Sequence, residues 1–295
     1  MTPAPENLLH RPLTTPKCTL GCPLLDRCLA GGFPCNSITE LFAESGCGKT
    51  QLCLQLALSA QLPVSLGGLS GSSLYIHTEF PFPSRRLHQL SHAFRSTYPA
   101  IFKTDPCDSI FVHAVHSADQ LLDILPKMES FLSDPKTHLP VKLIVIDSIA
   151  ALFRSEFENS PVELKRRSSL FFKISGKLKL LAKRFGLAVV VTNQVVDLIV
   201  PEGINGMRIG NLACLYSSGR RVCPALGLAW ANCVNSRLFL SRNEEVEKEE
   251  KGLVDVDANR VCTRTRRRLH VVFAPHLPEG SCELVITREG VFGVE

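Results

Sequence analysis

The stretch Ile38-Thr39-Glu40-Leu41-Phe42-Ala43-Glu44-Ser45-Gly46-Cys47-Gly48-Lys49-Thr50-Gln51 decides the fold. An apolar strand leads into a loop of small residues, which ends in Gly-Lys-Thr and opens a leucine-rich helix. Backbone N–H groups of such a loop and the positive helix N-terminus face the phosphates of a nucleotide. In this pattern Lys49 reaches the β- and γ-phosphates, and the Thr50 hydroxyl is a ligand of Mg²⁺. The stretch predicts a site for ATP and Mg²⁺, with the nucleotide bound by Ala43, Glu44, Ser45, Gly46, Cys47, Gly48, Lys49, Thr50 and Gln51.

One residue of this loop departs from the usual pattern. Ala43 stands where the pattern has its first glycine. A methyl group is tolerated there if the backbone φ angle is negative. The alternative is a glycine-rich turn that opens an ordinary helix. A second open question concerns Cys47, which lies near a helix N-terminus and Lys49. That environment lowers the pKa of a thiol, whereas a buried and inert Cys47 is equally compatible with the sequence.

Composition describes an ordinary globular protein. The chain of 295 residues is 45% hydrophobic and 21% charged, and is long enough for one large α/β domain or two small ones. Its net charge of +5 permits an anionic partner. The sequence contains neither an apolar run of membrane-spanning length nor an apolar signal core, so we expect no membrane contact. Twelve cysteines form no C-x-x-C pair, which favours reduced thiols in the nucleus or cytosol over a zinc site.

Strand and helix signals alternate through most of the chain. Apolar runs predict strands over residues 37–42, 74–77, 109–113, 141–147 and 187–192. The segments between them have helical periodicity, with caps at Ser84, Ser117 and Ser160. This alternation predicts a doubly wound, mostly parallel sheet. Four prolines make residues 1–17 a flexible lead-in, so the predicted core is 18–295.

The rhythm changes after Pro224. Short strands are predicted over residues 237–240, 269–274 and 283–287, as an antiparallel extension of the same sheet. The acidic run 244–250 and the basic run 264–268 are interpreted as a solvated connection between strands.

Polar residues follow three of the predicted parallel strands. Because ligands bind at the carboxyl ends of such strands, these residues are expected near the nucleotide. Asp147 can hold Mg²⁺ through water, and Glu79 can orient or deprotonate the attacking water. The amide of Gln194 can sense the γ-phosphate. For each of these three residues the alternative is that it merely ends a strand and begins a turn, without a role at a nucleotide.

Together these fragments resemble the RecA family of recombinases. Residues 75–79, 147–154 and 185–195 are similar to the eukaryotic strand-exchange recombinase and its paralogues. Residues 20–26, 224–232 and 274–278 narrow the resemblance to one paralogue. The resemblance covers about residues 17–295 and implies a RecA-like P-loop ATPase core whose nucleotide site is closed by a neighbouring subunit.

The resemblance also assigns roles to single residues. Glu79 matches the catalytic glutamate, assisted by Lys49, and Arg86 matches the arginine that lies against adenine. Residues 154–167 and 197–222 match two DNA-binding loops. Within these loops the predicted DNA contacts are Arg154, Arg208, Arg220 and Arg221, whose guanidinium groups would bind phosphates without reading sequence. A solvated loop without DNA is the alternative for the second segment.

Three departures from the family pattern favour an accessory subunit over a filament-forming recombinase. Residues 159–161 read Asn-Ser-Pro in place of Gly-Arg-Gly, and Asn232 replaces a histidine that reads a neighbour's nucleotide. A helix-hairpin-helix domain is also expected to be missing. Residues 1–17 contain no phenylalanine, so the chain is expected to accept a partner's segment at strand 109–113 without donating one. We expect an end-capping subunit.

Three functions are compatible with these patterns. The leading one is a weak, DNA-dependent ATPase subunit of a recombinase-paralogue complex, acting in homologous recombination repair of double-strand breaks and in meiosis. Its expected partners are single-stranded or branched DNA and either another recombinase paralogue or the strand-exchange recombinase, in the nucleus and also the cytoplasm. The second is an ATP-binding scaffold with negligible turnover. The third is a small-molecule P-loop kinase, which would need a lid of arginines.

Overall fold

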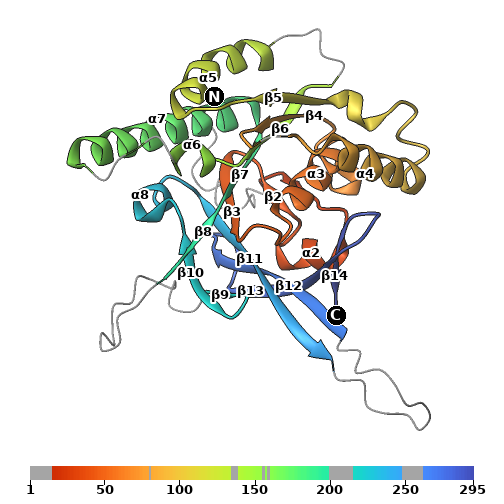
Figure 1. Ribbon diagram of the computed structural model, residues 1–295. Helices are drawn as coiled ribbons and strands as arrows, with labels where there is room; N and C mark the ends of the chain where they lie inside the picture. Colours follow the sequence, from red (N-terminus) through yellow and green to blue (C-terminus); the bar gives the residue numbers. More distant parts are fainter. Residues whose placement is uncertain are drawn as a thin grey trace, which may run out of the picture.

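The computed structural model describes residues 15–79, 81–133, 139–154, 157, 160–198, 215–247 and 262–295. Most of the predicted lead-in, residues 1–14, and the predicted DNA contact Arg208 lie outside these residues. A nine-stranded sheet forms the centre of the fold, in the order β14-β13-β12-β11-β3-β7-β6-β4-β5 (Figure 1). Among the described residues, no helix is both long and apolar enough to span a membrane.

The parallel half of the sheet matches the predicted alternation. Its strands are β3 (Ser37–Ala43), β4 (Ser72–His77), β5 (Ile110–Ala114), β6 (Val141–Asp147) and β7 (Ala188–Asn193). Neighbouring strands in the order β3-β7-β6-β4-β5 are all parallel. The central strands are buried on both faces, which is why β6 is almost wholly apolar up to its terminal Asp147.

Helices cover both faces of this half. On one face α3 (Lys49–Ser59) and α4 (Ser84–Thr97) pack into a core that includes Leu52 and Leu90. On the other, α5 (Ala118–Leu132), α7 (Pro161–Phe185) and α8 (Gly227–Ala231) pack around Phe171 and Trp230. The doubly wound α/β prediction is confirmed, and it brings the carboxyl ends of the parallel strands to one edge (Figure 1).

Helix starts follow the predicted caps in two of three cases. Ser117 and Ser160 accept hydrogen bonds from the backbone N–H groups three residues later, at 3.0 and 3.3 Å. The prediction for Ser84 was wrong, since Ser84 is the first residue of α4 and Pro83 occupies the cap position without a side-chain bond. Proline fixes its own φ near helical values, so it can lead into a helix without a capping hydroxyl.

The C-terminal part corrects one prediction and extends another. Its strands are β11 (Ser236–Glu247), β12 (Cys262–Phe273), β13 (Gly280–Ile286) and β14 (Val291–Val294). They extend the sheet as predicted and pair antiparallel, but β11 joins β3 in parallel. The charged runs were predicted as a connection, yet Glu244–Glu247 and Arg264–Arg268 lie inside the paired strands. Opposite charges across the ladder explain this, as in the 3.0 Å contact between Arg266 Nε and Glu245 Oε2.

Short elements complete the described chain. The strands β1 (Lys17–Cys18) and β2 (Phe33–Pro34) flank α2 (Pro23–Cys28), so the predicted lead-in ends in a paired strand. The 3₁₀ helix η1 (Val64–Leu66) follows α3, and the 3₁₀ helix η2 (Pro106–Ser109) directly precedes β5. Short α6 (Ala151–Arg154) follows β6. A separate three-stranded sheet contains β8 (Val195–Asp197), β10 (Arg220–Pro224) and β9 (Tyr216–Ser217).

Both predicted DNA loops therefore contain regular structure. The first segment, 154–167, begins at the last residue of α6 and includes the first turns of α7, because Ser160 and Pro161 start that helix. The second, 197–222, includes the end of β8, all of β9 and part of β10.

Candidate functional site

The phosphate loop lies between the end of β3 at Ala43 and the start of α3 at Lys49. Gly46 and Gly48 have positive φ angles of 79° and 111°, which a side chain would strain. A Cβ atom on Gly48 would also lie 2.5 Å from Cδ1 of Ile286. Among the described non-glycine residues, positive φ occurs only at Ala30, Asn36, Ser70 and Ser218. Ala43 thus has the negative φ that tolerates its methyl group, as predicted.

Lys49 lies across this loop. Its Nζ donates to the carbonyl oxygens of Ala43 and Glu44 at 2.8 and 2.9 Å. Burial lowers the pKa of the ammonium group, and the nearby Asp147 carboxylate opposes that shift. The ammonium is thus held over the loop by two neutral acceptors that a phosphate oxygen can replace.

Asp147 accepts three hydrogen bonds from hydroxyl groups. Its Oδ2 binds Thr50 Oγ1 and Tyr75 Oη, both at 2.7 Å, and its Oδ1 binds Thr192 Oγ1 at 2.6 Å. Hydroxyl and carboxylate oxygens are the ligands that Mg²⁺ prefers. The two predicted metal ligands, Thr50 and Asp147, are therefore brought together, and this oxygen-rich site fits the ion. The sequence analysis missed Tyr75 and Thr192, which lie on β4 and β7, the two strands on either side of β6.

Glu79 accepts hydrogen bonds from two other predicted site residues. Nη2 of Arg154 and Nε2 of Gln194 both lie 3.0 Å from its Oε1. Both side chains of the Glu79–Arg154 pair are more than half exposed. The predicted catalytic acid is thus joined to the end of α6, which leads into the predicted first DNA loop, and to the amide at the end of β7.

A cavity of about 550 Å³ joins these residues. The phosphate loop, Glu79, Asp147 and Gln194 line one side, and residues of the C-terminal strands line the other. The latter residues, which the sequence analysis missed, are Arg267, Ile286 and Thr287. Their role becomes visible only from the sheet order, which places β11 beside β3.

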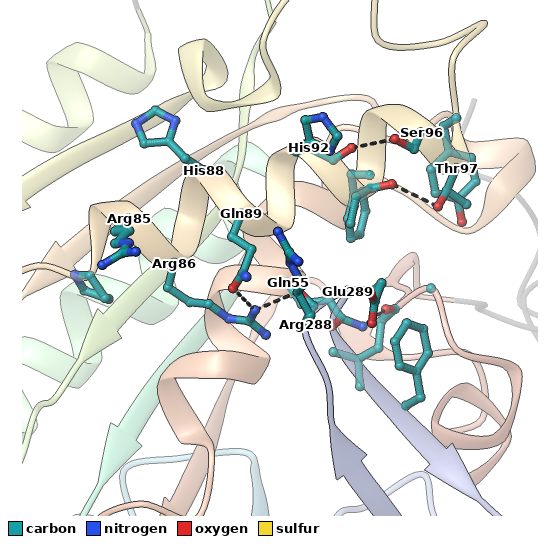
Figure 2. Close-up of a pocket in the computed structure, with 17 residues that line it drawn as sticks. Gln55, Arg85, Arg86, His88, Gln89, His92, Ser96, Thr97, Arg288 and Glu289 are labelled. Carbon is teal, nitrogen blue, oxygen red and sulfur yellow. Dashed lines mark hydrogen bonds between the residues drawn. The ribbon is translucent and has the colours of Figure 1, made fainter.

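Arg86, on α4, forms one end of this cavity. Its Nε donates to Gln51 Oε1 at 2.6 Å, and its Nη2 and Nη1 donate to the carbonyl oxygens of Thr287 and Arg288, both at 2.7 Å. Figure 2 shows this side chain at the edge of a second cavity, of about 1150 Å³, between α4 and the β13–β14 turn. Arg86 thereby fastens that turn to α3 and α4, while its predicted contact with adenine stays a prediction.

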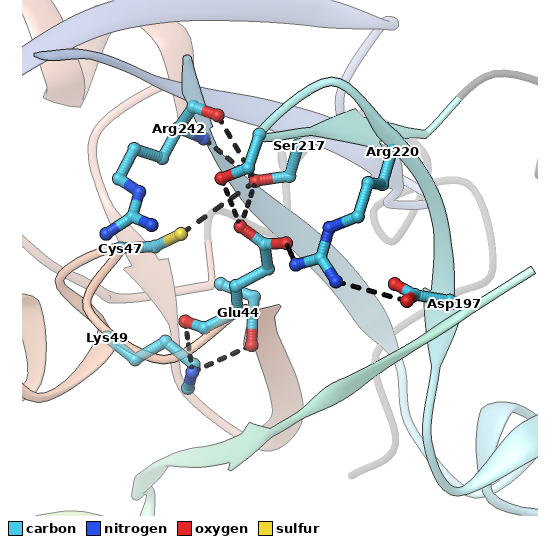
Figure 3. A network of polar contacts seen from close by, with 9 residues as sticks. Glu44, Cys47, Lys49, Asp197, Ser217, Arg220 and Arg242 are labelled. Atoms are coloured by element: carbon cyan, nitrogen blue, oxygen red, sulfur yellow. Dashed lines mark hydrogen bonds and ion pairs between the residues drawn. The ribbon is translucent and has the colours of Figure 1, made fainter. Parts of the chain in front are cut away.

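Glu44 connects the phosphate loop to the small sheet (Figure 3). Its carboxylate accepts hydrogen bonds from the hydroxyls of Ser217 and Ser218 at 3.0 and 2.7 Å and from Nη2 of Arg220 at 2.5 Å. Burial by itself would raise the pKa of Glu44, but the bonds from Ser218, Ser217 and Arg220 hold it below its ordinary value. Glu44 is thus an ionised acceptor at neutral pH.

The predicted DNA contacts on β10 are engaged inside the chain. Arg220 binds Asp197 Oδ2 at 3.1 Å through Nη1, in addition to Glu44. Arg221 donates from Nε to Tyr216 Oη at 2.7 Å and lies over its ring. Their contact with DNA remains a prediction.

The structure contradicts the reactive interpretation of Cys47. This residue is fully buried, and burial raises the pKa of its thiol despite the nearby Lys49 and a contact with Ser217. The sequence offered two signals for a lowered pKa, the positive helix end and Lys49, and desolvation outweighs them.

Comparison with known proteins assigns a family to this arrangement. A sequence profile of the Rad51 family matches residues 14–212, more than half of the chain. The chain belongs to the Rad51 family. It is 59% identical over 296 residues to the DNA repair protein XRCC3 homolog of Arabidopsis thaliana, covering 99% of this chain and 97% of the relative. It is 36% identical to the DNA repair protein XRCC3 of Mus musculus, covering 94% and 75%, and 35% identical to mouse DNA repair protein RAD51 homolog 2, covering 73% and 63%.

These relatives confirm the resemblance read from the sequence. The RecA-like core and the narrower likeness to the XRCC3 paralogue are both shown, while the part that residues 20–26, 224–232 and 274–278 play in that likeness stays a prediction. The part matched by the Rad51 profile contains the phosphate loop, Glu79, Asp147 and Gln194. Arg220 and the C-terminal wall of the cavity lie beyond it.

Proposed function

We propose that this Rad51-family protein is an ATP-binding subunit of a recombinase-paralogue complex, with weak ATPase activity that depends on DNA. It acts in homologous recombination repair of double-strand breaks and in meiosis, in the nucleus and also the cytoplasm. The names of its relatives support a role in DNA repair. The single observation that supports DNA dependence is the Arg154–Glu79–Gln194 contact.

The residues of the cavity fit ATP with Mg²⁺. Backbone N–H groups of the loop and the Lys49 ammonium bind the phosphates, while Thr50 and Asp147 hold the metal directly or through water. Held by Thr50 and Asp147, Mg²⁺ would supply positive charge against the phosphates. Glu79 orients the attacking water or accepts its proton.

DNA dependence follows from what Glu79 contacts. Arg154 and Gln194 both donate to its Oε1, and the contact with Arg154 fixes the orientation of the carboxylate. An exposed ion pair contributes only about 0.2–1 kcal/mol, so a DNA phosphate can draw Arg154 away from Glu79. Binding of single-stranded or branched DNA then releases the carboxylate from Arg154, so that it can turn toward the attacking water.

The same contact supports a second function, an ATP-binding scaffold with negligible turnover. If Arg154 stays on Glu79 with DNA bound, the protein holds ATP only to stabilise its complex with another paralogue or with the strand-exchange recombinase.

Steady-state ATP hydrolysis, measured with and without single-stranded DNA, tests both proposals. For the ATPase we expect DNA stimulation in the wild type, and a raised basal rate without stimulation in Arg154→Ala. Arg184→Ala is the matched control, since Arg184 lies near the other end of α7, outside both predicted DNA segments, and forms an exposed ion pair with Glu129. ATP binding without hydrolysis under either condition would support the scaffold. Failure to bind ATP would overturn both.

A further inference from the structure

Two arginines face each other across the C-terminal hairpin. In the antiparallel pair β11–β12, Arg242 lies directly opposite Arg267. Successive side chains of a strand point to opposite faces, so Arg266 and Arg268 lie on the other face of β12. There Arg266 contacts Glu245 and Glu283, and Arg268 contacts Glu283.

The face that carries Arg242 and Arg267 leads to the phosphate loop. The preceding pair on this face, Leu240 and Leu269, is fully buried in the same core as Ala43 and Cys47. Arg267 lines the cavity that contains Gly46 and Lys49. Nη1 of Arg242 lies 3.2 Å from the position that a Cβ atom on Gly46 would take, and Figure 3 shows its guanidinium beside Cys47.

Neither guanidinium is neutralised by a described residue. The Nε atoms of Arg242 and Arg267 are buried and have no hydrogen-bond partner within the described part of the chain. Glu44, the carboxylate within the loop, is already engaged by Arg220 and two serines, and Asp147 by three hydroxyls.

Such an arrangement is unfavourable without a ligand. Like charges directly opposite each other destabilise a strand pair, and buried polar groups without partners carry a desolvation cost. Lys49 adds a third positive charge to the same cavity wall. Within the described part of the chain Arg242 and Arg267 have no ion-pair partner, so an anion from solution would balance their charge.

We infer that Arg242 and Arg267 form a phosphate-binding pair, which contacts the phosphates of the bound nucleotide from the C-terminal sheet. The planar guanidinium fork suits phosphate oxygens, to which it donates two parallel hydrogen bonds. The inference rests on the proposed ATP site and adds a second wall to it. A single chain would then contact the phosphates from the loop on one side and from β11–β12 on the other.

Isothermal titration with ATP, ADP and AMP tests the pair. Because a hydrogen bond to a charged group contributes about 1.5–3 kcal/mol, Arg242→Ala and Arg267→Ala should each weaken ATP binding by about tenfold to a hundredfold. AMP, with a single phosphate, should lose less. Arg268→Ala is the matched control on the opposite face and should bind ATP like the wild type. Arg267→Lys should recover part of the affinity, because it keeps the charge and loses the fork.

Thermal unfolding provides a readout that a purely structural role would not give. Without nucleotide, Arg242→Ala and Arg267→Ala should unfold at the wild-type temperature or above it, because a repulsion has been removed. With ATP, their rise in unfolding temperature should be smaller than that of the wild type. If an alanine variant does not fold, Arg267→Lys and Arg267→Gln are compared in the same way.

The two proposals fail in different ways. If Lys49→Ala loses ATP while Arg242→Ala and Arg267→Ala bind it like the wild type, the pair is overturned and the proposed ATP site stands. If the wild type does not bind ATP, the proposed site itself fails. Equal losses for ATP and AMP would also overturn the pair, since they would show a general disturbance of the cavity.

Discussion

At the scale of single residues, the chemistry of the site depends on which carboxylate oxygens already accept hydrogen bonds from other side chains. Glu79 illustrates this, because its Oε1 is shared by Arg154 and Gln194. We predict that Glu79→Gln keeps ATP affinity within about twofold and abolishes DNA-stimulated hydrolysis, since the amide keeps the shape and loses the base. ATP titration and a phosphate-release assay measure the two properties. Residual stimulated hydrolysis near the wild-type rate would assign the base to another group.

Cys47 shows how burial decides thiol reactivity. Because the residue is fully buried and its pKa is raised, we predict that N-ethylmaleimide leaves it unlabelled at neutral pH, with or without ATP. Mass spectrometry of tryptic peptides measures the labelling, and labelling after denaturation is the control. Rapid labelling of the native protein that ATP suppresses would instead restore the reactive interpretation.

At the scale of elements, the C-terminal strands are fastened to the helix that follows the phosphate loop. Gln55 on α3 is buried, and its Nε2 donates to the carbonyl oxygens of Leu20 and Val291, while its Oε1 accepts from the N–H of Val291. We predict that Gln55→Leu lowers the free energy of unfolding by about 2–4 kcal/mol, because three backbone groups lose their partner. Urea denaturation measures the change. A loss below about 0.5 kcal/mol would mean that water replaces the amide.

The edge strand β5 is the candidate acceptor for a partner. It ends the nine-stranded sheet, and the side chain of Val112 on it is 42% exposed. We predict that Val112→Lys abolishes binding of a recombinase paralogue and leaves the unfolding temperature within about 2 °C, since surface substitutions change stability little. Val196→Lys on β8 is the control, because Val196 is similarly exposed (49%) and lies in the separate three-stranded sheet. Unchanged co-purification of the partner with Val112→Lys would move the contact elsewhere.

The elements that could be predicted are those fixed by local patterns. The wholly buried strand β6 appears as an unbroken apolar run, and Ser160-Pro161 marks the start of α7 by its own hydrogen bonding. The charged ends of β11 and β12 could not be predicted, because their pairing depends on Glu245 meeting Arg266 across the hairpin. Likewise, Asp147 was identified from a strand end, whereas Arg242 and Arg267 become site residues only through the order of strands in the sheet.

At the scale of the whole molecule, we expect this subunit to accept a segment from a partner without donating one to the next subunit. Residues 1–17 contain no phenylalanine, so they offer no donor of the predicted kind for a neighbour's sheet edge, and we expect contacts of that kind between like copies not to propagate. We predict that the purified protein with ATP and single-stranded DNA forms no helical filaments longer than a few subunits in negative-stain electron micrographs. The strand-exchange recombinase under the same conditions is the positive control. Long filaments of this protein alone would refute the end-capping role.

Arg267, Ile286 and Thr287 form the wall of the cavity opposite the phosphate loop, and they are synthesised long after that loop. The phosphate loop is synthesised early, but its opposite wall is complete only after β12, β13 and Thr287 have been translated. A nascent chain therefore carries a complete loop motif long before the cavity has its second wall. A message truncated just before β13 would produce a protein with an intact motif and half a site, so a frameshift near the 3′ end should be as damaging as a substitution of Lys49.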